Sequence, residues 1–421
     1  MFNFQNLDKK KTGLIVGFFL FIIIIGYLMY IMFFRPIIIY QEQQEAAKKA
    51  GQLPTKLEGQ PTGIITDPDT GELTGGEIVT RIPAEQGRKI DNIARGGITK
   101  VDTIDYNKTS FIKMDDKGQK LISYHPDLGK FYKIGADGEK IELTSKVYKD
   151  VQDIAWNPSK DAAILEFPDG SNIYYDFEQD KQISLPKDWT EFSFNQQGSN
   201  ISFKDMNNIE DYRFYAIAKP DGSSVKYLEP LGYKDKDFVA DWSPSGKITG
   251  YMKAGADGES QKLYFIGQYE ESFNTLRVMG FGLETKWTPD GQKMVYSAHN
   301  QYTDHKPLLH IVDANGDNIG ANHQTLDVNT WADKCTFQDN STLYCAVPKE
   351  MPWGADYQPA IMVERQISDY IYKIDLATGV KTFIAEPEND FIVEDMQVSE
   401  DGSKLYFTDA NSKALHSINL K

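Results

Sequence analysis

A five-residue turn recurs along the chain, each time between two short runs in which apolar and polar residues alternate. The best copy is residues 287–291 (Trp-Thr-Pro-Asp-Gly), with a near copy at 242–246 (Trp-Ser-Pro-Ser-Gly) and a looser one at 156–160 (Trp-Asn-Pro-Ser-Lys). Alternation is typical of a half-buried β-strand, and Pro-Asp-Gly suits a tight turn because glycine adopts positive φ without steric cost. The pattern therefore predicts a β-hairpin at each copy, which we interpret as the inner hairpin of a β-propeller blade.

Seven such hairpins follow one another when the chain is aligned on the apolar residue four positions before the end of each turn. These residues lie about 40 to 60 positions apart, close to the spacing of four-stranded propeller blades. They are Met114, Trp156, Phe194, Trp242, Trp287, Phe337 and Val398. A further apolar run follows most of them, for example at 173–176, 263–266 and 371–375, and predicts a third strand. Residues 98–421 are therefore predicted to form an all-β, seven-bladed propeller of four-stranded blades.

The two ends of this region predict how the ring closes. The last repeat ends after its third strand, at residues 414–420, and residues 98–101 (Ile-Thr-Lys-Val) stand just before the first repeat. We expect residues 98–101 to form the missing fourth strand of the last blade, because a closed ring leaves no exposed sheet edge.

The Trp-Ser/Thr-Pro-Asp-Gly pattern at 242–246 and 287–291 resembles a known repeat. It is similar to the WD40-like repeat of the Tol system's periplasmic propeller protein and of the propeller domains of prolyl-oligopeptidase-type enzymes. The resemblance covers residues 98–421 and implies the propeller fold. The small α/β domain that precedes the Tol propeller is not evident, and no hydrolase domain follows the seventh repeat, so the resemblance implies no activity.

A long uncharged segment precedes the repeats. The 22 residues from Gly13 to Phe34 contain no Asp, Glu, Lys or Arg. A helix of this length spans roughly 33 Å, which is enough to cross a bilayer. No small-residue cleavage pattern follows closely, so residues 13–34 are predicted to be an uncleaved transmembrane anchor rather than a signal peptide.

The flanks of the anchor predict its orientation. Lysines at 9–11 precede it, whereas Arg35 is the one basic residue that follows closely. The positive-inside rule then predicts a cytoplasmic tail of residues 1–12 and places the remainder outside the cytoplasm. Residues 35–97 contain scattered Pro and Gly and are predicted to be an extracytoplasmic linker. The expected location is therefore the cell membrane, with the lipid bilayer as one partner.

Charge and motifs narrow the chemistry. Acidic residues outnumber basic ones by 61 to 45, and the formal net charge is −16. An acidic surface repels phosphate backbones, which argues against nucleic acid as a partner. The sequence has no Gly-x-Ser-x-Gly elbow, P-loop, His-Glu-x-x-His or Cys-x-x-Cys motif, so it indicates no catalytic residue, metal or cofactor.

The connections between second and third strands point to a binding face. They lengthen in repeats three to six, at residues 204–212, 253–261, 297–307 and 346–368. The last one carries Met351, Trp353, Tyr357 and Met362, and its neighbour carries His299, Tyr302 and His305. Exposed aromatic residues in such loops are typical of binding sites. We interpret the two histidines as part of this polar loop rather than as a metal site. The alternative for Trp353 is that it packs within its own loop.

The two cysteines are compatible with a location outside the cytoplasm. Cys335 and Cys345 flank a predicted hairpin turn at equal distances. Residues opposite each other in an antiparallel hairpin have Cα atoms roughly 4.5–5.5 Å apart, within the range of a disulfide. The sequence predicts a Cys335–Cys345 bridge, with two buried thiols as the alternative.

Together these features predict a membrane-anchored propeller that acts outside the cytoplasm as a non-enzymatic binding or scaffolding module at the cell envelope, with a protein partner. Two alternatives stay open. One is a propeller hydrolase or lyase that acts on a glycan or peptide, which converging carboxylates would favour. The other is a subunit of a secretion or pilus assembly, in which residues 13–34 would pack on partner helices.

Overall fold

The computed structural model describes residues 89–115, 117–269, 271–353, 355 and 360–421, together with the backbones of β1 (Gly63–Thr66) and β2 (Leu73–Gly76), which pair antiparallel. The chain divides into two compact units, Met1–Gln86 and Gly87–Lys421. Within the described part of the chain, no helix has the length and apolarity needed to cross a membrane. The predicted anchor at 13–34 lies outside the described residues.

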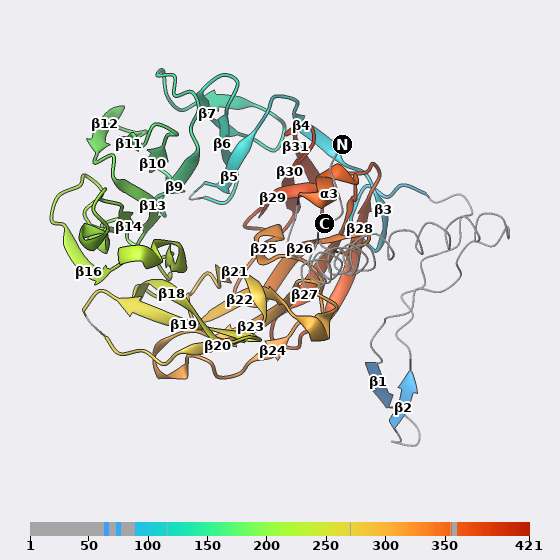
Figure 1. Ribbon diagram of the computed structural model, residues 1–421. Coiled ribbons are helices and arrows are strands. Elements are labelled where there is room, and N and C mark those ends of the chain that lie inside the picture. The colour runs from blue at the N-terminus through green and yellow to red at the C-terminus, as the bar shows by residue number, and fades with distance from the viewer. Residues whose placement is uncertain are drawn as a thin grey trace, which may run out of the picture. The chain divides into compact units, whose positions relative to one another are not determined.

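The unit Gly87–Lys421 is a ring of seven antiparallel sheets, which confirms the predicted seven-bladed propeller (Figure 1). Blade one contains β5 (Ser110–Met114), β6 (Leu121–His125), β7 (Lys130–Ile134) and β8 (Lys140–Glu142). Blade two contains β9 (Asp153–Trp156), β10 (Ala162–Glu166), β11 (Asn172–Asp176) and β12 (Lys181–Leu185). Blade three contains β13 (Trp189–Phe194), β14 (Ile201–Asp205), β15 (Phe214–Ala218) and β16 (Lys226–Pro230).

The next blades continue around the ring in the same order. Blade four contains β17 (Phe238–Ala240), β18 (Ile248–Asp257), β19 (Ser260–Gly267) and β20 (Leu276–Met279). Blade five contains β21 (Phe281–Trp287), β22 (Lys293–His299), β23 (Leu308–Asp313) and β24 (Gln324–Thr325). Blade six contains β25 (Cys335–Phe337), β26 (Thr342–Pro348), β27 (Asp369–Asp375) and β28 (Lys381–Pro387), and blade seven begins with β29 (Val393–Val398), β30 (Lys404–Asp409) and β31 (Leu415–Asn419).

Short helical turns occupy several connections. They are η1 (Glu210–Tyr212), η2 (Gly232–Asp237), η3 (Gln301–Thr303), η4 (Gly316–Asn318), η5 (Ala332–Lys334) and α3 (Ile361–Glu364). Each contains six residues or fewer, so the fold depends on the blades and not on helices.

The recurring apolar residue of each turn ends the innermost strand of its blade. First strands of neighbouring blades contact one another around the axis of the ring. Six of the seven aligned residues are the last residue of a first strand, and Trp242 comes two residues after Ala240, the end of β17. The predicted inner hairpins and the predicted third strands are therefore confirmed.

The aromatic residue at this position packs one blade onto the previous one. Trp156 of blade two meets Phe131 of blade one edge-on, with ring centroids 5.8 Å apart. Trp287 of blade five likewise lies 6.1 Å from Phe265 of blade four. Large rings bury much apolar area at such a junction and also gain from aromatic pairing. In blades two and five, the Trp of the turn pattern thus has a packing role at the junction with the previous blade.

The ring closes through a strand that the sequence did not single out. Strand β4 (Asp102–Asp105) pairs antiparallel with β31 and completes blade seven, whereas β3 (Gly97–Thr99) pairs in parallel with β28 as a fifth strand of blade six. Closure of the last blade by N-terminal residues is therefore confirmed, but the prediction that residues 98–101 perform it is wrong. Residues 98–101 are more apolar than the adjacent extended residues of β4, and the sequence therefore favoured them as the closing strand. The parallel pairing of β3 with the outer edge of blade six has no local sequence pattern by which it could be predicted.

The predicted disulfide is present in blade six. Cys335 and Cys345 are directly opposite in the pairing of β25 with β26, with Cα atoms 4.1 Å apart, and their sulfurs are bonded at 2.09 Å. Both side chains are fully buried. The bridge thus joins the two innermost strands of the blade within the core.

The connections leave the ring on two sides. In a four-stranded antiparallel blade, the link from second to third strand and the link to the next blade leave from the same side. We call this side the loop face, and the opposite side, with the turns after the first and third strands, the hairpin face.

One predicted loop on the loop face is instead a hairpin. Residues 253–261 were expected to form a connection, but β18 and β19 continue through them to a tip at Gly258 and Glu259. The small residues Ala254 and Gly255 are weak strand formers on their own. They pair with Lys262 and Gln261 across the hairpin, and this backbone ladder extends the strands beyond their intrinsic preference.

Candidate functional site

The loop face carries most of the large apolar side chains that are exposed in or beside the described connections. On this face they are Tyr106, Leu128, Val147, Ile209, Tyr212, Tyr233, Met279, Phe281, Tyr302, Trp353 and Val363, whereas Val225, Tyr269 and Val380 lie on the hairpin face. Exposed apolar side chains that gather on one side of a molecule indicate an interaction site. The loop face is therefore the candidate functional surface.

Trp353 projects from this face. Its side chain is 85% exposed, so the alternative in which it packs within its own loop is not what the structure shows. The interior of the loop is filled instead by Met362 and Met351, which pack with Trp331. Tyr357 lies outside the described residues. Of the four residues predicted in this loop, Trp353 is thus the one that the structure shows to be available to a partner.

The neighbouring loop of blade five presents Tyr302, which is 77% exposed. Its turn begins at Asn300, whose side-chain oxygen accepts the Tyr302 N–H at 2.8 Å, while the Asn300 N–H donates to the Thr303 hydroxyl at 3.0 Å. This reciprocal capping fixes the turn although it is only three residues long. The loop therefore presents Tyr302 from a defined backbone.

The two predicted histidines of this loop lie together at its base. His299 ends β22 and is buried, and the His305 ring lies 6.3 Å from it, measured between ring centroids. His305 and Asp304 both have positive φ, 55° and 51°, which turns the chain sharply back toward β23. Among the residues that the structure describes, no group of three or more His, Cys, Asp or Glu is arranged to hold a metal ion.

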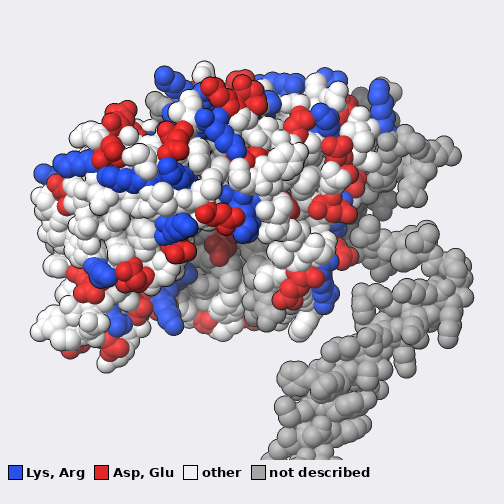
Figure 2. All heavy atoms as spheres, turned by 90° about the horizontal axis from the view of Figure 1, so that it is seen from above, with Lys and Arg blue, Asp and Glu red and all other residues white. Residues whose placement is uncertain are grey.

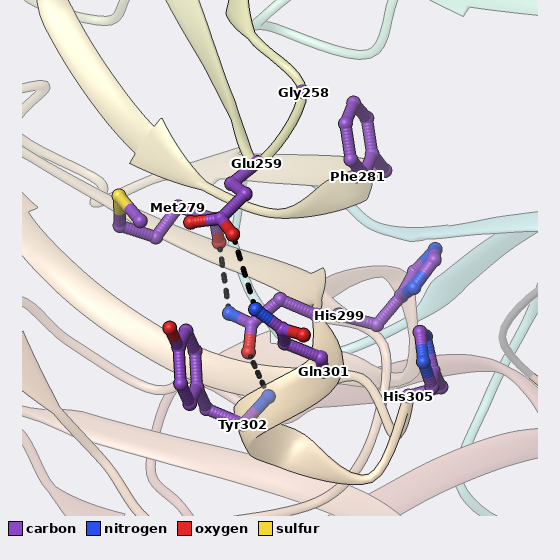
Figure 3. A pocket seen from close by; sticks show the side chains of 9 residues that line it. Gly258, Glu259, Met279, Phe281, His299, Gln301, Tyr302 and His305 are labelled. Carbon is purple, nitrogen blue, oxygen red and sulfur yellow. Dashed lines mark hydrogen bonds between the residues drawn. The ribbon is translucent and has the colours of Figure 1, made fainter.

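A cavity of about 250 Å³ opens between blades four and five on the loop face. Three connections enclose it: the β18–β19 tip, the link from blade four to blade five, and the loop after β22. Its lining residues are Gly258, Glu259, Met279, Phe281, His299, Asn300, Gln301, Tyr302 and His305 (Figure 3). The cavity thus unites the three residues predicted in the loop of blade five: His299, Tyr302 and His305.

Hydrogen bonds hold the three connections together. The Gly280 N–H donates to the Glu259 carbonyl at 2.8 Å, and the Asn300 side chain donates to the Met279 carbonyl at 3.3 Å. The Gln301 side chain donates to the Glu259 carboxylate at 3.1 Å, as Figure 3 shows. The walls of the cavity are therefore bonded to one another.

Sequence reasoning missed several residues of this surface. Glu259, Met279 and Phe281 line the cavity from blade four and its link to blade five, and Tyr212 and Tyr233 extend the exposed row across blades three and four. Glu259 lies in residues 253–261, which the sequence predicts to be an open loop, and for this reason it was not recognised as a candidate. Phe281 follows Gly280, a local turn signal, and the pairing of β21 with β22 places it opposite His299 within blade five.

Charged side chains of both signs, Lys and Arg among Asp and Glu, are interspersed on the side of the propeller that Figure 2 shows. Beside the axis, burial raises the pKa of Asp241 to about 6 and lowers the pKa of Lys286 to about 8. The Lys286 ammonium donates to the Cys335 carbonyl of the next blade, which gives it a structural contact.

The comparisons with known proteins agree on the fold. No protein-family model and no curated protein matches the sequence. The β-propeller domain of Cps50 (Swd1) from Myceliophteria thermophila has a TM-score of 0.50 at 10% identity, over 76% of this chain and 100% of that domain. An oligogalacturonate lyase in complex with manganese has a TM-score of 0.49 at 12% identity, over 79% of this chain and 96% of that one.

A streptogramin B lyase gives a similar result, with a TM-score of 0.49 at 10% identity over 76% of this chain and 97% of that one. The TM-scores of both lyases are too low to support an argument about activity. At these identities the likeness concerns the fold alone. The chain is thus a seven-bladed β-propeller by its sheet topology, and the likeness to the Cps50 (Swd1) propeller domain agrees with that fold.

Proposed function

We propose that the protein is a non-enzymatic binding module that engages a protein partner through the loop face of its propeller. We also propose that residues 13–34 anchor it in the membrane of the cell envelope with the propeller outside the cytoplasm, and that its inner hairpins are WD40-like repeats. The observation that carries the proposal is the concentration of exposed aromatic side chains on one face, with Trp353 and Tyr302 on adjacent blades.

The chemistry of these side chains supports a protein partner. Trp and Tyr supply large contact areas with few rotatable bonds, and they are enriched among residues that dominate binding energy. Leaving Trp353 and Tyr302 exposed keeps apolar area in contact with water in the free protein, and a partner that covers them would recover that area. The capped turn at Asn300 holds Tyr302 ready for such a contact.

The test is site-directed photocrosslinking in the cells that produce the protein. A photoreactive phenylalanine analogue is placed at position 353, 302 or 269 of the full chain, and crosslinked products are compared after irradiation. We expect position 353 or 302 to give a discrete product of the same partner in repeated experiments. Tyr269 is 73% exposed but lies on the hairpin face, so position 269 should not give that product.

A variant pair completes this test. Trp353→Ala combined with Tyr302→Ala should reduce the yield of that partner about tenfold or more, because each ring is worth roughly 1–2 kcal/mol at the centre of an interface. Tyr269→Ala is the matched control and should leave the yield unchanged. Equal products from all three positions, or an unchanged yield in the double variant, would contradict the proposal. Melting temperatures measured in parallel identify any loss caused by unfolding.

The proposed anchor is tested separately. Deletion of residues 1–40 should move the protein from the alkaline-washed membrane fraction to the soluble fraction, because the uncharged stretch of residues 13–34 would then be missing. Retention of the shortened chain on washed membranes would contradict the anchoring role. Protease added to intact cells or to spheroplasts should cut the full-length propeller if it lies outside the cytoplasm.

A further inference from the structure

We infer that the cavity between blades four and five receives the positively charged end of a lysine or arginine side chain of the protein partner. This inference rests on the proposed function, since it names the chemistry by which the same face recognises its partner. Three properties of the cavity carry it: the aromatic walls, the carboxylate and the size.

The walls are rings and a thioether that water already reaches. Tyr302 is 77% exposed, and Phe281 and Met279 are each 44% exposed. In Figure 3, Met279 and Tyr302 lie along one side of the cavity and Phe281 lies near the two histidines on the other. The face of an aromatic ring is negative and attracts an ammonium or guanidinium group, while the ring also packs on the methylene stem of such a side chain.

The charge of the lining favours a cation. Glu259 supplies a carboxylate, and no Lys or Arg is among the described residues that line the cavity. One Glu259 oxygen accepts from the Gln301 amide at 3.1 Å, which orients the carboxylate toward the loop of blade five. On the neighbouring strand β20, Arg277 is already held by Asp257 at 2.5 Å and by the Ser260 hydroxyl at 3.1 Å. An anionic ligand would therefore meet a carboxylate and no compensating cation.

The size of the cavity favours a single side chain. Sites for drug-sized ligands usually enclose roughly 300–1,000 Å³, and this cavity of about 250 Å³ lies below that range. An oligosaccharide would project far beyond it, whereas one long side chain presented by a bound segment would fill it. The framework is formed in advance by the Gly280 and Asn300 hydrogen bonds, so binding requires little reorganisation.

The experiment uses small probes that each carry one feature of the proposed side chain. Full-length protein in detergent is labelled with ¹³C at the methionine methyl groups, and the Met279 signal is assigned with the variant Met279→Leu. The probes are N-acetyl-lysine methylamide and N-acetyl-arginine methylamide, and their uncharged counterparts carry acetylated lysine or citrulline. We expect the cationic probes to shift the Met279 signal saturably at millimolar concentrations, and the uncharged ones to bind at least about tenfold more weakly.

Two substitutions test the named groups. Glu259→Gln should weaken binding of the cationic probes about tenfold, and Tyr302→Ala about fivefold, while Tyr302→Phe should bind as the wild type does because the ring is kept. Glu271→Gln is the matched control. This substitution removes one carboxylate charge from a surface pocket of about 570 Å³ on the hairpin face, and it should leave the binding of the cationic probes unchanged.

The inference would be overturned if an uncharged probe bound as well as its cationic counterpart, or if N-acetyl-glutamate methylamide bound tightly. It would also be overturned if Glu259→Gln left the affinity for the cationic probes unchanged, or if no probe shifted the Met279 signal. Failure here is distinct from failure of the proposed function. Partner crosslinking through position 353 does not require the cavity, and binding of the probes does not require the partner.

Discussion

At the scale of single residues, the shape of the loop-face cavity depends on Gly280. Gly280 lies between Met279 and Phe281 with a φ of +108°, a conformation that side-chain-bearing residues rarely adopt. A Cβ at this position would collide with the carbonyl oxygen of His299. Because the Gly280 N–H also bonds the Glu259 carbonyl, this glycine allows the link between the blades to approach both neighbours.

The variant Gly280→Ala should therefore lower the free energy of unfolding by about 1–3 kcal/mol, through backbone strain and the collision with His299. It should also displace the cavity wall and weaken binding of the cationic probes. The control is Gly255→Ala in β18, where an added Cβ meets no atom within 4 Å, and its effect should stay within about 0.5 kcal/mol. Urea unfolding of both variants beside the wild type measures the difference.

A pair of histidines on blade five predicts acid sensitivity. The His310 and His323 rings stack with centroids 5.1 Å apart, and the His323 Nε2 atom lies 2.7 Å from the Tyr296 hydroxyl oxygen. Burial, and then the charge of His323, lowers the pKa of His310 to about 4, and burial also lowers the pKa of His323. The folded protein thus holds both rings neutral at a pH where the unfolded chain would protonate them.

The contribution of His310 to the free energy of unfolding is therefore fully present above the ordinary histidine pKa of about 6.5. It is lost as the pH falls toward 4, because between these pH values the unfolded chain binds more protons than the folded protein. We expect the free energy of unfolding to drop between pH 7 and pH 4.5, and the drop to be smaller by about 2 kcal/mol in His310→Gln. Denaturant unfolding at a series of pH values measures it. The same pH dependence in both proteins would show that His310 is not the cause.

At the scale of elements, the junction between blades six and seven depends on a buried ion pair. The Lys334 ammonium, at the end of η5, lies 2.8 and 2.7 Å from the two carboxylate oxygens of Asp369 at the start of β27. One of these oxygens also accepts the Val393 N–H of β29 at 2.8 Å. Asp369 is fully buried, and burial raises its pKa while Lys334 opposes that shift.

Lys334→Met should lower the free energy of unfolding by about 3–5 kcal/mol, because it leaves the Asp369 carboxylate buried without its counter-charge. The double variant Lys334→Met with Asp369→Leu should be destabilised by less than the sum of the two single variants. Thermal unfolding of the four proteins completes the cycle. Strictly additive effects would mean that the pair does not act as a unit.

The elements that could be predicted from the sequence are those specified by a pattern within a few neighbouring residues. Trp287 and its turn specify a hairpin within ten residues, and the pairing of Cys335 with Cys345 follows from the symmetry of one turn. The closing strand could not be assigned, because residues 98–101 and β4 are both short and extended, and only their distant partners β28 and β31 distinguish them. The length of the connection at 346–368 predicted that Trp353 and Met351 share a loop, but not which of them packs inward.

The candidate site was predictable to the extent that it lies within one blade. Tyr302 and His299 were found because they share a loop of unusual length. Phe281 pairs with His299 across β21 and β22 of the same blade, whereas Glu259 belongs to blade four, and its proximity to the loop of Tyr302 is set by the angle between blades four and five. No pattern along the chain encodes that angle, since it results from packing around the whole ring.

At the scale of the molecule, the ring is a single closed structure whose last blade contains both early and late parts of the chain. Asp105, the final residue of β4, is almost fully buried. Its carboxylate lies 3.2 Å from His125 and 2.7 Å from the Lys140 ammonium, both in blade one. Strand β4 thus completes blade seven and also bonds it to blade one, so its contribution exceeds that of an ordinary edge strand.

Two truncations should separate these roles. A chain that begins at residue 101 loses β3 but keeps β4, whereas one that begins at residue 107 loses both. We expect the second to be less stable than the first by about 3 kcal/mol or more and to aggregate, because the edge of β31 becomes exposed. Light scattering and thermal unfolding compare them. Equal behaviour of the two chains would show that β4 does not close the ring in solution.

The parallel strand β3 gives the ring a mechanical property. A bridge between Asp91 and Thr99, and the pairing of β3 with β28, both precede β4 along the chain. Asn92 and Ala94 also precede β4, and both bond Asn419 at the end of β31, so a pull on the N-terminal side would load blades six and seven together. The segment before β4 therefore connects the N-terminal side to two neighbouring blades, which distributes such a load over both of them.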